Sequence, residues 1–156
     1  MSQVDVSPEQ LRRDPAAFAD AVLHRNEKGQ PWSLSAYQRR VLALAFRWGE
    51  AGALLIRLLL WSEPKKGGKT FLAAVLGLWW AFVTPHTEVI VVANDLEQAV
   101  GRVFKTMVAL IRANPALKTY ITIRATELQF TNGTVVTAIA SEYRGAAGSR
   151  HSLVIF

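Results

Sequence analysis

Two adjacent glycines, a lysine and a threonine, Gly67 to Thr70, stand between two strongly apolar segments of the chain. Glycines let a backbone approach a bound group closely, because no Cβ stands in the way. A strand before such a loop and a helix after it would turn amide hydrogens and the positive end of the helix toward an anion. This arrangement predicts an α/β fold, in which strands and helices alternate along the chain.

The loop is a candidate site for the phosphate chain of a nucleotide. Lys69 is expected to contact the β- and γ-phosphates, and the hydroxyl of Thr70 is expected to ligate Mg²⁺. The usual signature, G-x-x-x-x-G-K-[ST], is incomplete because Glu63 stands at its first glycine position. The alternative is a basic surface turn that contains this short string by chance. The residues predicted to bind the phosphates are Pro64, Lys65, Lys66, Gly67, Gly68, Lys69 and Thr70.

Composition indicates a globular chain that suits an anionic partner. The 156 residues are 51% hydrophobic and 19% charged, with a net charge of +6, which favours a nucleotide or nucleic acid as the partner. The absence of cysteine excludes disulfides and thiolate metal sites. No secretory signal opens the sequence, and the apolar run Phe71–Val83 is shorter than the roughly 20 residues of a membrane-spanning helix. We therefore expect no membrane association and a cytoplasmic setting.

Capping signals near the N-terminus predict three helices. Ser7 and Asp14 each precede a proline, which is favoured in the first helical position. Ser35 is followed three residues later by Gln38, the spacing of a capping box. The polar run 26–31 between the second and third helices is expected to form a loop.

The rest of the chain alternates between predicted strands and helices. A buried strand around Leu58–Trp61 should precede the phosphate loop, and a helix from Thr70 to about Phe82 should follow it. Further strands are expected at 89–92, 121–123, 128–130, 135–139 and 153–156, with a hairpin turn at Asn132-Gly133. Asp95 should cap a helix that ends at Asn114-Pro115, with Leu96, Val100, Val103, Met107 and Leu110 on its inner face. The pattern predicts a largely parallel sheet flanked by helices.

Pro64–Thr70 resembles the variant phosphate loop of tailed-phage terminase large subunits. In that family the first glycine is often missing, and a basic residue early in the loop is typical. Lys65 falls on that basic position, which is usually arginine, and the resemblance implies that it helps to stabilise the transferred phosphate. Lys65 and Lys69 are thereby implied as catalytic residues, although a lysine is a point charge without the bidentate fork of arginine.

Other segments resemble the same family in the same order. Residues 32–38 resemble the glutamine motif that recognises adenine, which implies that Gln38 reads the adenine edge and that Tyr37 packs nearby. A purely local capping role for Gln38 is the alternative. Residues 141–148 resemble the loop before the Walker B strand, and Leu153–Phe156 resembles that strand. Arg144 and Arg150 are candidates to sense phosphate in a neighbouring subunit.

The resemblance implies the N-terminal ATPase part of an ATP-driven motor that packages DNA into capsids. Residues 1–31 would be a helical lead-in, and 32–156 would be a partial P-loop NTPase domain of the RecA-like (ASCE) type, incomplete at its C-terminus. ATP and Mg²⁺ are the implied cofactors. Implied partners are double-stranded DNA, the portal, the small terminase subunit and other copies in a ring, in the cytoplasm of the bacterial host at the procapsid portal.

Two expectations qualify this function. In the family, two acidic residues follow the Walker B strand, and this sequence ends at Phe156 before either appears. We therefore expect a truncated chain that binds nucleotide and hydrolyses ATP negligibly. A non-catalytic nucleotide-binding remnant and another P-loop ATPase, such as a helicase, remain as alternatives.

Overall fold

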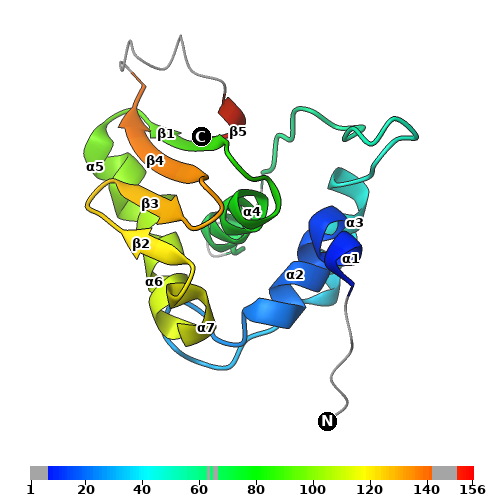
Figure 1. The fold of residues 1–156 in the computed structure, drawn as a ribbon, viewed down its shortest axis with the longest axis horizontal. Helices are drawn as coiled ribbons and strands as arrows, with labels where there is room; N and C mark the ends of the chain where they lie inside the picture. The colour runs from blue at the N-terminus through cyan, green and yellow to red at the C-terminus, as the bar shows by residue number, and fades with distance from the viewer. Residues whose placement is uncertain (1–6, 63, 65–66, 142–150) are drawn as a thin grey trace.

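The computed structural model describes residues 7–62, 64, 67–141 and 151–156. Its strands form one mixed sheet of five in the order β2-β3-β4-β1-β5, with helices packed against it (Figure 1). The chain is therefore α/β, as predicted. The strands are β1 (Glu88–Ala93), β2 (Ile121–Ile123), β3 (Glu127–Phe130), β4 (Val135–Ala140) and β5 (His151–Ile155).

The sheet is mixed, so the prediction of a largely parallel sheet was wrong. β1 pairs in parallel with β4 and β5, but β3 pairs in antiparallel fashion with both β2 and β4. The cause is the tight connection at Asn132-Gly133, because a turn of this length can only join antiparallel neighbours. The predicted hairpin is confirmed, with Gly133 at a φ of 83°. The parallel part of the sheet is β4-β1-β5.

The helices begin where capping side chains place them. Ser7, Asp14 and Ser35 each accept a hydrogen bond from a backbone N–H of the following turn, and the capping box of Ser35 and Gln38 is complete. The predicted N-terminal helices are thus confirmed. The helices are α1 (Pro8–Arg13), α2 (Pro15–Val22), α3 (Ala36–Ala45), α4 (Lys69–Val83), α5 (Leu96–Ala99), the π-helix η1 (Val100–Phe104), α6 (Lys105–Ala113) and α7 (Pro115–Lys118).

The helix predicted to start after Asp95 forms as the consecutive elements α5, η1 and α6. Asp95 caps it, and Met107 and Leu110 are fully buried on its inner face, as predicted. Leu96 is exposed, so its assignment to that face was wrong. Leu96 lies in the first turn of this helix, before η1. The π-helical turn changes the angle between residues before and after it, so Leu96 does not share a face with Met107 and Leu110 at the α-helical spacing that the prediction assumed.

Helix α4 runs antiparallel to β5. Trp80 Nε1 in α4 donates to Ser152 Oγ in β5 at 2.9 Å. Gly77 lies three residues before Trp80 in α4, and Ile155 lies three residues after Ser152 in β5. These two residues are also neighbours, because a Cβ added at Gly77 would lie 3.1 Å from Cδ1 of Ile155. The N-terminus of α4 therefore lies at the edge of the sheet where the parallel strands β4, β1 and β5 end. Open α/β sheets bind their ligands at this edge.

Residues 58–61 form no strand, so the strand predicted before the loop was wrong. Leu58 is 75% exposed and Leu60 is 86% exposed. A strand is stabilised by ladder hydrogen bonds and by burial on at least one face, and neither is realised for these leucines in the described part of the chain. Trp61 is half-buried against the core, and it anchors this extended segment just before the loop.

The N-terminal helices pack on α4 and share one core with the sheet. Phe18 of α2 lies with its ring centroid 5.6 Å from that of Phe82, at the far end of α4. Trp79 is fully buried, and its Nε1 donates to the carbonyl of Leu11 at 2.9 Å. The lead-in helices cover the face of α4 that the sheet does not contact (Figure 1).

We predict that Asn132→Ala lowers the free energy of unfolding by about 2 kcal/mol, because it leaves polar groups without partners. Asn132 Nδ2 donates to the carbonyls of Ala81 and Phe82 at 2.8 and 3.1 Å, and its Oδ1 accepts from Thr134 N at 3.0 Å. Urea unfolding followed by circular dichroism measures the change. Asn94→Ala is the matched control, because the Asn94 side chain is exposed. Equal stability of the two variants would contradict the prediction.

Candidate functional site

Helix α4 begins at the glycine pair with a left-handed residue. Gly68 has a φ of 95° and is the N-cap of the helix. Because glycine has no side chain, the first turn receives no side-chain cap from this position. The first helical bond runs from Leu72 N to Gly68 O at 2.9 Å. The amide hydrogens of Lys69, Thr70 and Phe71 therefore precede the intrahelical ladder. The first turn carries no acidic residue, so the positive end of the helix dipole is not neutralised within it.

A pocket of about 480 Å³ opens at this helix start. Five of the residues predicted to bind phosphate line it together: Pro64, Gly67, Gly68, Lys69 and Thr70. The Lys69 ammonium donates to the carbonyl of Pro64 at 3.5 Å, so the side chain lies across the loop. Lys65 and Lys66 lie outside the described residues, as do Glu142 to Gly148 with Arg144, and Arg150.

The amide of Gly67 serves the loop itself. Gly67 N donates to the carbonyl of Pro64 at 3.2 Å and closes a turn. Of the two glycines predicted to bind phosphate, Gly67 therefore has its amide occupied within the loop, and Gly68 lies at the start of α4. Only a residue without a Cβ adopts the backbone of Gly68 without strain, since its φ is strongly positive.

Gln38 reaches the loop from α3. Its Oε1 accepts from Ser35 N at 3.0 Å, which is the capping-box bond. Its Nε2 faces the loop, because a Cβ added at Gly68 would lie only 3.3 Å from that nitrogen. The local capping role is thus confirmed, and the nitrogen of the same amide lies close to Gly68. Tyr37 is 56% exposed and does not line the pocket among the described residues.

The pocket is also lined by three residues that the sequence patterns do not predict: Glu27, Phe71 and Thr106. Thr106 comes from the start of α6, where its Oγ1 donates to the carbonyl of Arg102 at 2.9 Å. The ring of Phe71 packs against Trp32 with centroids 4.6 Å apart, which draws the segment after the 26–31 loop toward α4. Glu27 lies in that loop. The residues next to a polar loop residue in the sequence do not indicate which distant residues it will lie beside in the fold.

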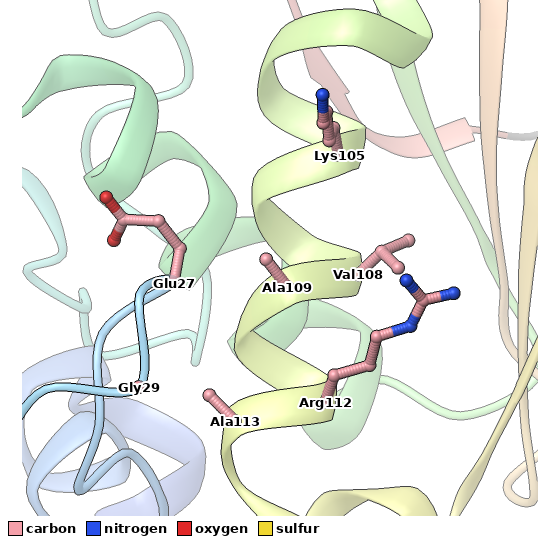
Figure 2. Close-up of a pocket in the computed structure, with 7 residues that line it drawn as sticks. All are labelled: Glu27, Gly29, Lys105, Val108, Ala109, Arg112 and Ala113. Atoms are coloured by element: carbon pink, nitrogen blue, oxygen red, sulfur yellow. The ribbon is translucent and has the colours of Figure 1, made fainter.

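A second, shallower pocket of about 370 Å³ adjoins the loop that carries Glu27 (Figure 2). Ala109 and Ala113 of α6 face Glu27 and Gly29, and their small side chains leave room between helix and loop. Figure 2 shows the Glu27 side chain directed away from α6, on the side of α4. Glu27 lines both pockets and so joins them.

No protein-family model matches the chain, and no curated protein is similar to it. None of the helices in the described ranges combines the length and the apolar character needed to cross a bilayer. Within the same ranges, no three His, Asp or Glu side chains come together in a group able to hold a metal ion. The chemistry of the site therefore has to be inferred from the geometry around α4.

We predict that Gly68→Ala lowers the free energy of unfolding by about 1–2 kcal/mol, because a Cβ is strained at positive φ and would crowd Gln38. Gly101→Ala is the matched control, since a Cβ there meets nothing within 4 Å and alanine favours a helix. Urea unfolding should show opposite signs for the two variants. A Gly68→Ala protein as stable as the parent would mean that α4 does not start from a left-handed residue.

Proposed function

We propose that this chain binds ATP at the start of α4, with the phosphates over Gly68 and the first helical turn. The observation that carries the proposal is the pocket in which Gly68, Lys69 and Thr70 meet at an uncapped helix N-terminus. Backbone amides, the helix dipole and a lysine ammonium there all favour a multiply charged anion. Gly68 carries no Cβ, so its backbone allows the close approach that a phosphate chain needs.

The position of the pocket in the fold supports a nucleotide over a random anion. It lies at the edge where β4, β1 and β5 end, and parallel α/β sheets hold nucleotides at this edge. Gln38, within reach of Gly68, supplies an amide that can pair with the edge of a purine base. Thr70 supplies a hydroxyl for the Mg²⁺ that accompanies the nucleotide, and most of the remaining Mg²⁺ ligands would be phosphate oxygens and water.

We further propose that the chain is the N-terminal ATPase part of a terminase large subunit, an ATP-driven motor that packages DNA. Support comes from the order of its segments: the capping box with Gln38, the phosphate loop, then the apolar strand β5 beside β1. The net charge of +6 is compatible with double-stranded DNA as a partner. The portal, the small terminase subunit, a ring of subunits and the host cytoplasm belong to the same proposal.

A second candidate is a nucleotide-binding protein without motor activity. The observation that favours it is the exposed segment at 58–61, because in the described part of the chain no strand precedes the loop predicted to hold the phosphates. Because the chain is expected to hydrolyse ATP negligibly under either candidate, binding of double-stranded DNA separates the two. An affinity for DNA that changes with bound nucleotide, measured by fluorescence anisotropy, supports the motor, and nucleotide binding without any binding of DNA supports the second candidate.

Lys69→Ala should weaken binding of a fluorescent ATP analogue by at least about tenfold, because a charge-assisted hydrogen bond to phosphate is lost. Lys118→Ala is the matched control, because it removes an exposed lysine at the end of α7. Fluorescence anisotropy measures both affinities. If Lys69→Ala binds as tightly as the control, the phosphates do not lie at this loop.

Gln38→Ala should reduce the preference for ATP over GTP by several-fold, because the side-chain amide that distinguishes the two base edges is removed. The substitution also breaks the capping box, so Ser35→Ala is the matched control: it removes the other half of the box and keeps Gln38. Competition of ATP and GTP against the fluorescent analogue gives the ratio. An equal loss in both variants would assign Gln38 to capping alone.

A further inference from the structure

The loop that carries Glu27 is held in one shape by its own hydrogen bonds. Asn26 Oδ1 accepts from Lys28 N and Gln30 N at 2.9 and 3.0 Å. Asn26 N donates to the carbonyl of Gln30 at 2.9 Å, and Arg25 Nη1 donates to the carbonyl of Gly29 at 2.7 Å. Gly29, at a φ of 77°, permits the tight return of the chain. These hydrogen bonds define the geometry of the turn.

A buried asparagine fastens this loop to α6. Asn114 is only 4% exposed, and its Oδ1 accepts from His24 N and Arg25 N at 2.9 and 3.0 Å. Its Nδ2 donates to the carbonyls of Arg25 and Leu110, each at 2.9 Å. One side chain thus satisfies the backbone on both sides and fixes the loop against the end of α6. The position of Glu27 relative to α4 follows from this anchor.

The anchored loop brings a carboxylate to a site that otherwise attracts anions. Glu27 lines the same pocket as Lys69 and Thr70, and its side chain is directed away from α6 (Figure 2). Among the described residues it takes part in none of the ion pairs, which join Arg13 to Glu9, Arg39 to Asp20 and His151 to Glu88. A carboxylate facing a phosphate chain is repelled by it, unless a cation lies between them.

A hydrated Mg²⁺ resolves this conflict. Mg²⁺ retains several water molecules when it is bound through phosphates, and those waters donate hydrogen bonds to nearby carboxylates. The hydroxyl of Thr70 lines the pocket on the α4 side. A ribose is a less suitable partner for Glu27, because the residues implied in base binding, Tyr37 and Gln38, are not among those that line this pocket.

We propose that Glu27 is a positioning residue for the hydrated divalent cation of a bound nucleotide, and that it makes the site select metal-bound over metal-free nucleotide. The inference rests on the proposed nucleotide site. The carboxylate accepts hydrogen bonds from the metal's water molecules and repels a nucleotide that arrives without its metal. Asn114 and the turn at 26–29 hold the backbone of Glu27 beside the pocket.

The test compares the affinity of the full chain for a fluorescent ATP analogue with Mg²⁺ and with EDTA. Glu27→Gln should weaken binding with Mg²⁺ and strengthen it with EDTA, each by up to about fivefold, the size of an exposed charge interaction. The ratio of the two affinities should therefore fall, by up to about 25-fold. Glu50→Gln, in another exposed turn, removes the same charge away from the pocket and should leave the ratio unchanged.

The outcomes separate this inference from the proposed function. If the parent chain binds the analogue, depends on Lys69 and shows the same ratio after Glu27→Gln, the role of Glu27 is overturned and the nucleotide site stands. If the parent chain binds no analogue under either condition, the nucleotide site itself fails. A Glu27→Gln variant that changes only the ratio between ATP and 2′-deoxy-ATP would assign the carboxylate to the ribose and overturn the metal role.

Discussion

The burial of α4 is the constraint on which the rest of the structure depends. The helix is apolar around almost its whole circumference, and such a helix must be covered on all sides. The sheet covers one side, α6 a second, and the lead-in helices a third. Each large side chain that becomes fully buried, such as Leu72, Leu78 and Trp79, stabilises the fold by about 1.5–3 kcal/mol. Residues from the two ends of the chain are thereby brought to the same helix.

Polar side chains convert this packing into fixed positions. Asn132 joins the hairpin turn to the C-terminal end of α4, and Asn114 joins the lead-in loop to α6. Each of the two satisfies backbone groups that would otherwise be left without partners where chain segments meet. Gln38 completes the cap of α3, and its amide nitrogen lies close to Gly68 at the start of α4. The loops around the N-terminus of α4 are therefore held by contacts with other elements. Loops held in this way position the residues of a binding site better than freely moving loops do.

The pocket at α4 combines two kinds of charge. The helix dipole and Lys69 favour an anion, and Glu27 opposes one unless a cation is present. Under the proposed function, a site of this kind would select the metal–nucleotide complex over the nucleotide alone. Residues 58–61, before the loop, form no strand, and Trp61 at the end of this segment packs against the core.

The local features of this chain were readable from the sequence because their hydrogen bonds join residues a few positions apart. The caps at Ser7, Asp14 and Ser35, the hairpin turn and the extent of α4 belong to this class, and so does the glycine-lysine start of the helix. The candidate site was therefore predicted in its central part, from Gly67 to Thr70.

Long-range packing decided everything else. Glu27 lines the pocket because Asn114, almost ninety positions later, holds its loop, and no local pattern records such a contact. The apolar run at 58–61 has the composition of a strand, yet strands exist only where a partner supplies ladder bonds and cover. Pairing order in the sheet likewise depends on which strands meet after α4 is buried. Hydrogen-bond chemistry between sequence neighbours fixed the elements, and the burial of one apolar helix fixed where they meet.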